Sequence, residues 1–265
     1  MPKKTKLMAI LNVTPDSFYE KSRTYNSLSA LKKGLTMEAE GADILDIGGF
    51  SSRPGSLPVD EEEELLRVIP PIQALIQEVK IPLSIDTTNP KVAAKALKEG
   101  CSYINDINGF INPEMRQVAK DTTGPLIVMH MQGSPLTMQN NPSYPEGIIK
   151  HLKQWFESRV NLMMKEGISK NRIILDPGIG FGKTVEHNFQ ILKSLQEIKN
   201  LGFPVLIGLS RKSFMGKILG KTSEELLYAS LALDSLAILA KVDIIRVHDV
   251  KEHRDVIDIL QPTFG

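Results

Sequence analysis

The 265-residue sequence contains only one cysteine, Cys101, and its charges almost cancel. A single cysteine excludes an internal disulfide and a zinc site built from several thiolates. Lys and Arg number 32 against 31 Asp and Glu, so the formal net charge is +1. Proteins that bind nucleic acid nonspecifically need a surplus of basic residues on one face. The composition therefore predicts no nucleic-acid partner.

Long hydrophobic runs are also lacking. The basic and then apolar start is interrupted by Asn12 and Pro15 before it reaches the length of a signal-peptide core. The most apolar stretch, Leu226–Ala240, contains Asp234 and is too short to span a bilayer. We therefore expect no membrane partner and a cytoplasmic location.

What the sequence does contain is a repeated pattern: a short apolar run, a polar or glycine-rich segment, and a helical stretch. Composition is that of a globular protein, with no linker or composition shift, so we predict one domain over residues 1–265. The spacing of the runs fits βα units of roughly 30 residues. Eight runs are predicted as strands: Leu7–Leu11, Asp43–Ile47, Pro82–Ile85, Tyr103–Ile104, Leu126–Met129, Arg172–Leu175, Pro204–Ile207 and Asp243–Val247.

The segments between the runs have helical patterns of their own. Asp60 followed by the four carboxylates Glu61–Glu64 is typical of a helix N-terminus, and Pro70 and Pro71 are expected to kink or divide that helix. Because the strand runs are continuously apolar, they favour a parallel sheet covered on both faces. Eight such units predict a (β/α)₈ TIM barrel of the α/β class. The alternative is an open doubly wound sheet, weakened by the absence of GxGxxG after the first run.

Polar residues follow each predicted strand, at the end of a barrel where active sites lie. Asp86, Asn105 and Asp176 have the chemistry to hold a flat, donor-rich heterocycle. Arg53, Lys212, Arg246 and His248 have the composition expected around a phosphate or diphosphate. The pattern therefore predicts a heterocyclic ligand with an anionic tail. The full set is Asn12, Asp46, Ser51, Ser52, Arg53, Asp86, Asn105, Asp106, His130, Asp176, Ser210, Arg211, Lys212, Arg246 and His248.

Structural interpretations of several of these residues remain open. Asp43 and Asp46 are candidates for capping turns, Asp106 for bonding loop backbone, and His130 for a buried histidine with its hydrogen bonds satisfied. Three further histidines fall in predicted helices and are expected at the surface: His151, His187 and His253. Gly182–Thr184 looks like the end of a P-loop, but Pro177 stands where the motif requires its first glycine.

Taken together, the strand-end segments resemble the dihydropteroate synthase family over nearly the whole chain. The matching segments are LNVTPDSF (11–18), IDIGGFSSRPG (around 44–55), SIDT (84–87), YINDI (103–107), VMHMQGSP (128–135), LDPGIGFGKT (175–184), GLSRKSF (208–214) and RVHDV (246–250). The resemblance implies a transferase of folate biosynthesis. Such an enzyme joins 6-hydroxymethyl-7,8-dihydropterin diphosphate to p-aminobenzoate and releases pyrophosphate. Dissociation of a diphosphate requires neutralisation of its charge, so an SN1-like path assisted by Mg²⁺ is expected.

The resemblance also implies roles for individual residues. Asp86, Asp176, Lys212 and Arg246 would be catalytic. The pterin would be held by Asp86, Asn105, Ile107, Met129, Asp176, Phe181, Gly208 and Lys212. The diphosphate would be bound by Asn12, Ser52, Arg53, Arg246 and His248, with Asn12 as the Mg²⁺ ligand. The p-aminobenzoate, with which sulfonamides compete in this family, would lie near Phe18, Pro54, Lys212 and Ser213.

The sequence differs from the family pattern at a few positions. Glu20 stands in a loop usually rich in Asp and Gly, Phe50 stands where an acidic residue is common, and Ser52 stands where Thr is common but keeps the hydroxyl. The differences at Glu20 and Phe50 leave open a pterin-binding protein without catalysis. The other alternative is a methyltetrahydrofolate:cobalamin-protein methyltransferase, which shares the barrel and the acidic pterin-binding residues but needs no diphosphate site. We also expect a homodimer that pairs through late helices, around Leu226–Ala240.

Overall fold

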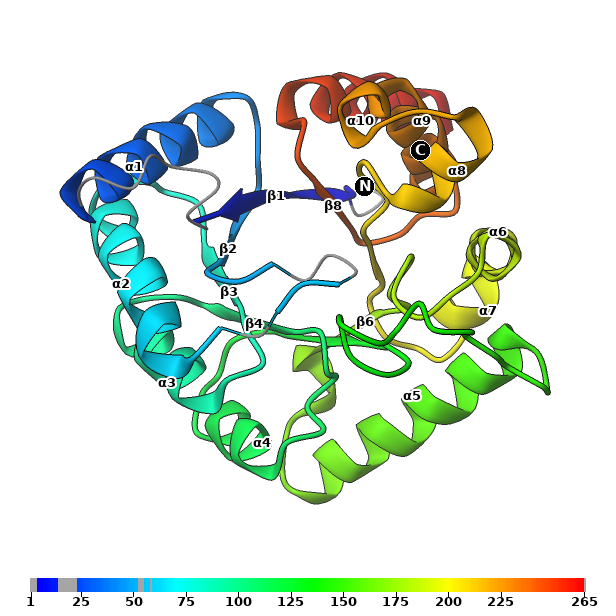
Figure 1. Ribbon diagram of the computed structural model, residues 1–265, viewed down its shortest axis with the longest axis horizontal. Helices are drawn as coiled ribbons and strands as arrows, with labels where there is room; N and C mark the ends of the chain where they lie inside the picture. Colours follow the sequence, from blue (N-terminus) through cyan, green and yellow to red (C-terminus); the bar gives the residue numbers. More distant parts are fainter. Residues whose placement is uncertain (1–3, 14–22, 52–54, 58, 265) are drawn as a thin grey trace.

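Figure 1 shows the computed structural model, which describes residues 4–13, 23–51, 55–57 and 59–264. Within these residues, eight parallel strands form the centre of the molecule. Their order in the sheet is β6-β5-β4-β3-β2-β1-β8-β7, and a bridge between Leu175 and Val205 joins the two ends. The sheet is thus a closed (β/α)₈ barrel, and the open-sheet alternative is wrong. The strands are β1 (Lys6–Asn12), β2 (Ile44–Gly48), β3 (Leu83–Asp86), β4 (Tyr103–Asp106), β5 (Leu126–Met129), β6 (Ile173–Asp176), β7 (Leu206–Ile207) and β8 (Ile244–Val247).

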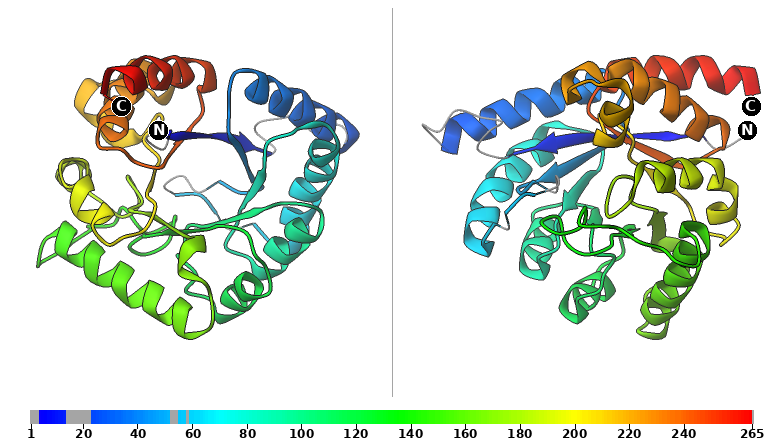
Figure 2. Two further views of the ribbon diagram at one scale, coloured as in Figure 1. Left: turned by 180° about the vertical axis from the view of Figure 1, so that it is seen from behind. Right: turned by 45° about the vertical axis from the view of Figure 1, so that its right-hand side comes forward.

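The helices form a ring outside the strands (Figures 1 and 2). The chain ends lie close together in these views, and Lys4 Nζ is 2.8 Å from Asp258 Oδ1. The helices are α1 (Arg23–Ala39), α2 (Glu61–Glu78), α3 (Pro90–Lys98), α4 (Pro113–Lys120), α5 (Ile148–Lys165), α6 (Val185–Lys193), α7 (Leu195–Lys199), α8 (Ser213–Leu219), α9 (Leu227–Leu239) and α10 (Val250–Phe264), with 3₁₀ turns η2 (Lys170–Arg172) and η3 (Ser223–Glu225).

Helix α2 is continuous through Pro70 and Pro71, so of the two predicted outcomes, a kink or a division, the division does not occur. Proline removes a backbone donor from the helix, but packing on both sides can compensate. Val68 precedes the prolines and Ile72 follows them, and both are fully buried in one core cluster. The shared core therefore holds the two halves in a single helix.

Two layers of side chains fill the barrel interior. An apolar cluster is formed by Met8, Ile44, Tyr103, Ile127, Ile174, Leu206 and Ile244. Because side chains alternate along a strand, the residues two positions later point to the same interior, one layer nearer the carboxyl ends. Asp46 follows Ile44 in this way, Asn105 follows Tyr103, and Asp176 follows Ile174. The apolar layer therefore supports a polar layer at the end of the barrel where chemistry is expected.

The apolar stretch 226–240 contains the whole of α9. Asp234 and Ala237 are buried, whereas Tyr228 and Leu236 are exposed. Within the described part of the chain, no helix is both long and apolar enough to cross a membrane.

Candidate active site

Arg246 is the centre of the polar layer. Its Nε donates to Asp46 Oδ2 at 2.6 Å, and its Nη2 donates to Asp86 Oδ2 at 2.6 Å. Asn105 Nδ2 donates to the same oxygen of Asp46 at 2.9 Å. Residues from β2, β3, β4 and β8 are thus brought into one network, although Asp46 and Arg246 are 200 positions apart in the sequence.

The two carboxylates of this network are buried with unused hydrogen-bonding capacity. Among the described residues, Oδ1 of Asp46 and Oδ1 of Asp86 have no hydrogen-bond partner. Burial raises the pKa of Asp86, and the Arg246 charge opposes that rise. Burial alone would lower the pKa of Arg246, but Asp46 and Asp86 raise it, so the guanidinium stays charged. Unpaired buried oxygens are costly, which favours a ligand that brings N–H donors.

A third carboxylate, Asp176, lies near a lysine, Lys212. Asp176 Oδ1 accepts a hydrogen bond from the backbone N–H of Gly178 at 2.7 Å. Burial raises the pKa of Asp176, while that hydrogen bond, Lys212, Arg246 and Lys183 oppose the rise. Lys212 Nζ lies 4.1 Å from the centre of the Phe181 ring. Burial also lowers the pKa of Lys212 to about 8, against the attraction of Asp176.

An apolar wall adjoins these charges. Ile107, Met129, Met138 and Phe181 form a separate buried cluster, and Phe50 packs against it. Three of the predicted pterin-wall residues, Ile107, Met129 and Phe181, are therefore together in space. The unusual Phe50 side chain is accommodated by hydrophobic contact with this cluster.

The residues predicted to bind diphosphate are only partly brought together. His248 Nδ1 is 3.0 Å from Ser210 Oγ, and burial lowers the pKa of His248 to about 3. His248 is therefore neutral, and it can act on an anion as an N–H donor but not as a charge. Arg246 points into the carboxylate network. The residues expected around the diphosphate are therefore not separated in space from those expected to hold the heterocycle. Arg211 is bound by both oxygens of Asp249 at 2.6 and 2.9 Å and serves the loop after β7.

Several predicted residues have a more limited description. Phe18, Ser52, Arg53 and Pro54, together with the divergent Glu20, lie outside the described residues. Ser213 is the first residue of α8, next to Lys212. A Cβ added to Gly208 would lie 3.8 Å from Arg246 Cβ, so the backbone of the strand passes close to the network.

Asn12 is the candidate magnesium ligand, and its surroundings fit that role. Asn12 Oδ1 and Asp86 Oδ2 both lie 3.7 Å from the position of a Cβ added to Gly48. Mg²⁺ prefers oxygen ligands and is commonly held by one or two side chains together with substrate phosphates. No group of three or more His, Cys, Asp or Glu suited to a metal occurs among the residues placed by the structure. These donors therefore fit a metal that a diphosphate helps to hold.

Two residues of this region show what the sequence left open or missed. Asp46, which the sequence makes both a strand-end candidate and a candidate for capping a turn, is fully buried in the network, as the period of two along β2 indicates. His253, expected at the surface, is fully buried and bonded to Asp234. By contrast, Asp106 does bond loop backbone: its oxygens accept from the N–H groups of Asn108 and Phe110.

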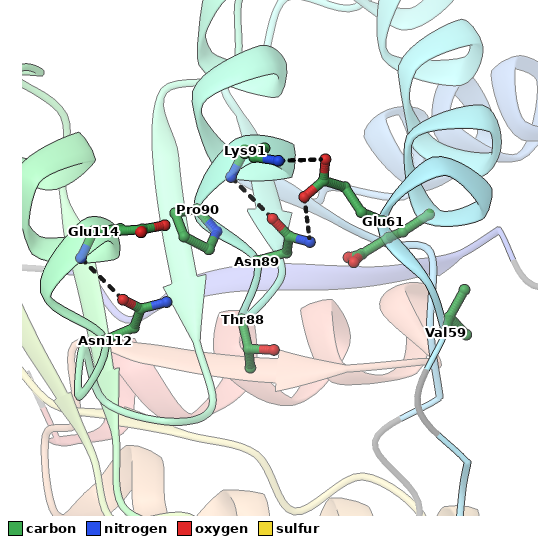
Figure 3. A pocket seen from close by; sticks show the side chains of 9 residues that line it. Val59, Glu61, Thr88, Asn89, Pro90, Lys91, Asn112 and Glu114 are labelled. Carbon is green, nitrogen blue, oxygen red and sulfur yellow. Dashed lines mark hydrogen bonds and ion pairs between the residues drawn. The ribbon is translucent and has the colours of Figure 1, made fainter.

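A separate polar cavity of about 510 Å³ lies where the N-termini of α2, α3 and α4 meet (Figure 3). Its walls include capping groups: Asn89 caps α3 and Asn112 caps α4. Glu61 there pairs with Lys91 at 3.1 Å. None of the network residues lines this cavity, so we assign it to helix capping and place the candidate site at the strand ends.

The barrel, the buried carboxylates and the adjoining apolar wall define an enzyme of the pterin-binding class. The sequence matches the family described as pterin binding enzyme over residues 8–248. It is 48% identical to the dihydropteroate synthase of Synechocystis over 94% of this chain and 86% of that protein. It is 41% identical to that of Escherichia coli over 98% and 92%.

Solved structures agree with the sequence matches. The dihydropteroate synthase of Yersinia pestis, solved in complex with a sulfonamide drug, superimposes with a TM-score of 0.93 at 39% identity, covering 98% of this chain and 94% of that one. The chain belongs to the dihydropteroate synthase family and is a transferase, as the strand-end segments predicted.

Proposed function

We propose that this chain condenses 6-hydroxymethyl-7,8-dihydropterin diphosphate with p-aminobenzoate to give 7,8-dihydropteroate and pyrophosphate. The observation that carries the proposal is the polar layer at the strand ends. In it, Asp46, Asp86, Asn105 and Asp176 surround Arg246 and Lys212 beside an apolar wall. Family membership supports the same reaction.

The pterin ring fits the acceptor-rich side of this layer. Its N–H groups would meet Oδ1 of Asp86 and the carboxylate of Asp176, and Asn105 would contact its amide edge. Phe181 and Met129 would cover the ring faces, since aromatic and thioether groups favour flat conjugated ligands. This arrangement supplies the donors that the unpartnered oxygens lack.

The diphosphate would lie toward Asn12 and His248. Bound Mg²⁺, held by Asn12 Oδ1 and the diphosphate oxygens, would neutralise charge on the leaving group. His248 would donate an N–H to a phosphate oxygen, with Ser210 fixing its ring. Ser52 and Arg53 remain predicted contacts from the segment after β2, while the guanidinium of Arg246 would reach the diphosphate from the polar layer.

The reaction breaks the C–O bond between the pterin methylene and the diphosphate and forms a C–N bond to the arylamine. In an SN1-like path the electron pair of the C–O bond leaves with pyrophosphate, and the methylene carries positive charge. The carboxylates of Asp86 and Asp176 would stabilise that charge in a site of low dielectric. The amine then attacks and loses its proton. Phe18, Pro54, Lys212 and Ser213 are the predicted p-aminobenzoate contacts.

Pyrophosphate release tests the proposal directly. With pterin diphosphate, Mg²⁺ and p-aminobenzoate, we expect release that depends on all three. Asp176→Asn should reduce turnover by roughly 10³-fold with an unchanged fold, because it removes charge stabilisation in the transition state. Pterin binding by calorimetry without any pyrophosphate release would instead assign a binding protein. Near-normal turnover of Asp176→Asn would refute the role of that carboxylate.

A further inference from the structure

Lys183 is a buried lysine whose ammonium group is enclosed by acceptors. Its side chain is only 3% exposed. Nζ lies 2.9 Å from the carbonyl oxygen of Phe181, 3.2 Å from that of His130 and 3.1 Å from His130 Nδ1. An ammonium group has three donors, and three acceptors are present. Burial lowers the pKa of Lys183 to about 7, and the Asp176 charge opposes this, but the acceptor set matches the charged form.

These contacts define the state of the neighbouring histidines. Because Nδ1 of His130 accepts from Lys183, its proton lies on Nε2, which is 3.1 Å from His151 Nε2. His130 then donates to His151, and its ring also packs edge-on against Trp155. The imidazole is therefore held at both nitrogens and cannot turn away from Lys183 without losing both contacts.

The loop over residues 177–183 lies directly against the chain that follows β5. A Cβ on Gly178 would collide with the carbonyl oxygen of His130, and one on Gly182 would lie 2.7 Å from that of Gln132. Tyr144 Oη donates to the carbonyl of Gly182 at 2.6 Å. Lys183 thus joins two backbone segments that already touch. One of these segments carries Phe181, and it begins directly after Asp176.

We propose that Lys183 is a positioning residue for pterin recognition, which fixes Asp176 and Phe181 by tying the loop after β6 to the end of β5. The inference rests on the proposed function, since it concerns the pterin site of that reaction. Lys183 does not need to touch the pterin. Its contribution is to hold the Phe181 backbone, and with it the ring that faces Lys212 Nζ.

An electrostatic contribution accompanies the geometric one. Asp176 is faced by three cations: Lys183 from its own loop, Lys212 from the loop after β7 and Arg246 from β8. Its backbone carbonyl accepts a hydrogen bond from the backbone N–H of His130, whose ring is neutral. Each of the three cations helps to keep the carboxylate ionised. If Lys183 is replaced by a neutral residue, Asp176 should take up a proton at higher pH. As the pH is lowered, pterin binding by the variant should therefore begin to weaken at a higher pH than binding by the wild type.

Calorimetric titration with 6-hydroxymethylpterin tests the proposal. Lys183→Met keeps the length of the side chain and removes the donors, so we expect roughly tenfold weaker binding, the order lost with a hydrogen bond to a charged group. The pH below which pterin binding weakens should also be higher than in the wild type. Lys199→Met is the matched control, because Lys199 Nζ donates to the Ala240 carbonyl from the opposite end of the barrel. It should lower the melting temperature but leave pterin binding unchanged.

A pair of His130 variants keeps the test decisive if Lys183→Met does not fold. His130→Asn retains an acceptor near the Nδ1 position and should bind pterin within about threefold of wild type, whereas His130→Leu removes it and should weaken binding roughly tenfold. Equal binding by both variants, or Lys183→Met binding within twofold with an unmoved pH profile, would overturn the proposal. Absence of binding by the wild-type protein would instead refute the proposed function.

Discussion

Arg246 shows how one side chain can organise a buried acidic site. Two buried carboxyl groups, Asp46 and Asp86, both bond to its single guanidinium. Breaking such a buried pair is expensive because the remaining ion has no partner. The unpartnered oxygens of both aspartates then favour a ligand rich in N–H groups. Asp46 therefore acts on the ligand through Arg246 and Asn105.

Replacement of Asp46 tests this indirect role. Asp46→Asn keeps the size of the side chain but removes the charge that orients Arg246 and Asn105. We expect kcat/KM for the pterin diphosphate to fall by about tenfold or more, the order of a charge-assisted hydrogen bond. Steady-state kinetics with p-aminobenzoate at saturation measures the change.

Asp43 provides the control, because it lies only three positions before Asp46 in the sequence. It lies just before β2, at the other end of the barrel, and also pairs with an arginine, Arg254, at 2.6 Å. Asp43→Asn should leave kcat/KM within twofold of wild type. Equal losses in both variants would show that Asp46 acts through general stability.

At the scale of single residues, the sequence predicted which residues surround the site but not which of them bond to one another. Asp86, Asn105 and Asp176 could be found because each ends an apolar run, and the ends of barrel strands converge. The contact of Asp46 with Arg246 could not, since it depends on β2 and β8, which are far apart in the sequence, lying on either side of β1 in the sheet. Lys183 was considered only as part of an incomplete P-loop, because no local pattern marks a lysine that turns inward.

The loops at the strand ends depend on glycine where backbones approach closely. Gly178 has a φ of 67°, and its Cβ would collide with the His130 carbonyl. Gly178→Ala should cost roughly 3 kcal/mol of unfolding free energy and abolish measurable pterin binding, because the loop must move away from β5. Denaturant unfolding and calorimetry report the two effects.

Gly220 is the control that separates the cost of a positive φ from the cost of a steric collision. Its φ of 64° is nearly the same, but no atom lies within 4 Å of an added Cβ. Gly220→Ala should therefore cost only about 1 kcal/mol and leave pterin binding intact. If both variants bound pterin equally, close approach of the loop would not be required for the site.

Helices α9 and α10 are joined by a buried histidine–aspartate pair. His253 Nε2 lies 3.0 Å from Asp234 Oδ2, and Nδ1 donates to the Asp249 carbonyl at 2.6 Å. Burial alone would lower the pKa of His253, but the hydrogen bond to Asp234 and its charge raise it. Burial raises the pKa of Asp234 as well. Both groups therefore hold protons more tightly in the folded state than in the unfolded chain.

Unfolding measured at two pH values tests this pair. A histidine with a raised pKa contributes stability that is fully present below its ordinary value of 6.5 and is lost as pH rises through the folded value. His253→Leu should cost about 3 kcal/mol at pH 6, because it leaves Asp234 buried without a partner. The difference between wild type and a variant in which both residues are Leu should be smaller at pH 8, because that variant keeps neither titrating group of the pair. Replacing Asp234 by Leu in the same chain should recover most of the loss, and a cost independent of pH would contradict the ion pair.

The elements themselves were largely predictable. Every predicted strand is present with bounds shifted by at most two residues at either end, because a continuously apolar run flanked by polar residues is a strong signal. The sequence left open whether Pro70 and Pro71 kink or divide α2, because the tendency of prolines to break a helix is local and the core that holds both halves is tertiary. The burial of His253 likewise depends on the packing of α9 against α10.

At the scale of the whole molecule, the exposed face of α9 bears on how two copies of the chain would meet. Tyr228 is 80% exposed, Leu236 54% and Leu239 40%, and their spacing places them with Ala232 on one face of the helix. Ile259 on the neighbouring α10 is 69% exposed. A contiguous apolar stripe of this kind is typical of an interaction surface. The expected homodimer through late helices would cover it.

Sedimentation velocity at micromolar concentration tests the predicted pairing. We expect the wild-type chain to sediment as a dimer and Leu236→Lys to sediment as a monomer, because burial of an unpaired ammonium group at the interface opposes association. Leu66→Lys is the control: Leu66 is 44% exposed on α2, across the barrel from α9, and its replacement should leave the dimer unchanged. A wild-type chain that sediments only as a monomer would refute the predicted dimer. The exposed stripe would then need another partner, whereas a dimer resistant to Leu236→Lys would place the interface on a different face.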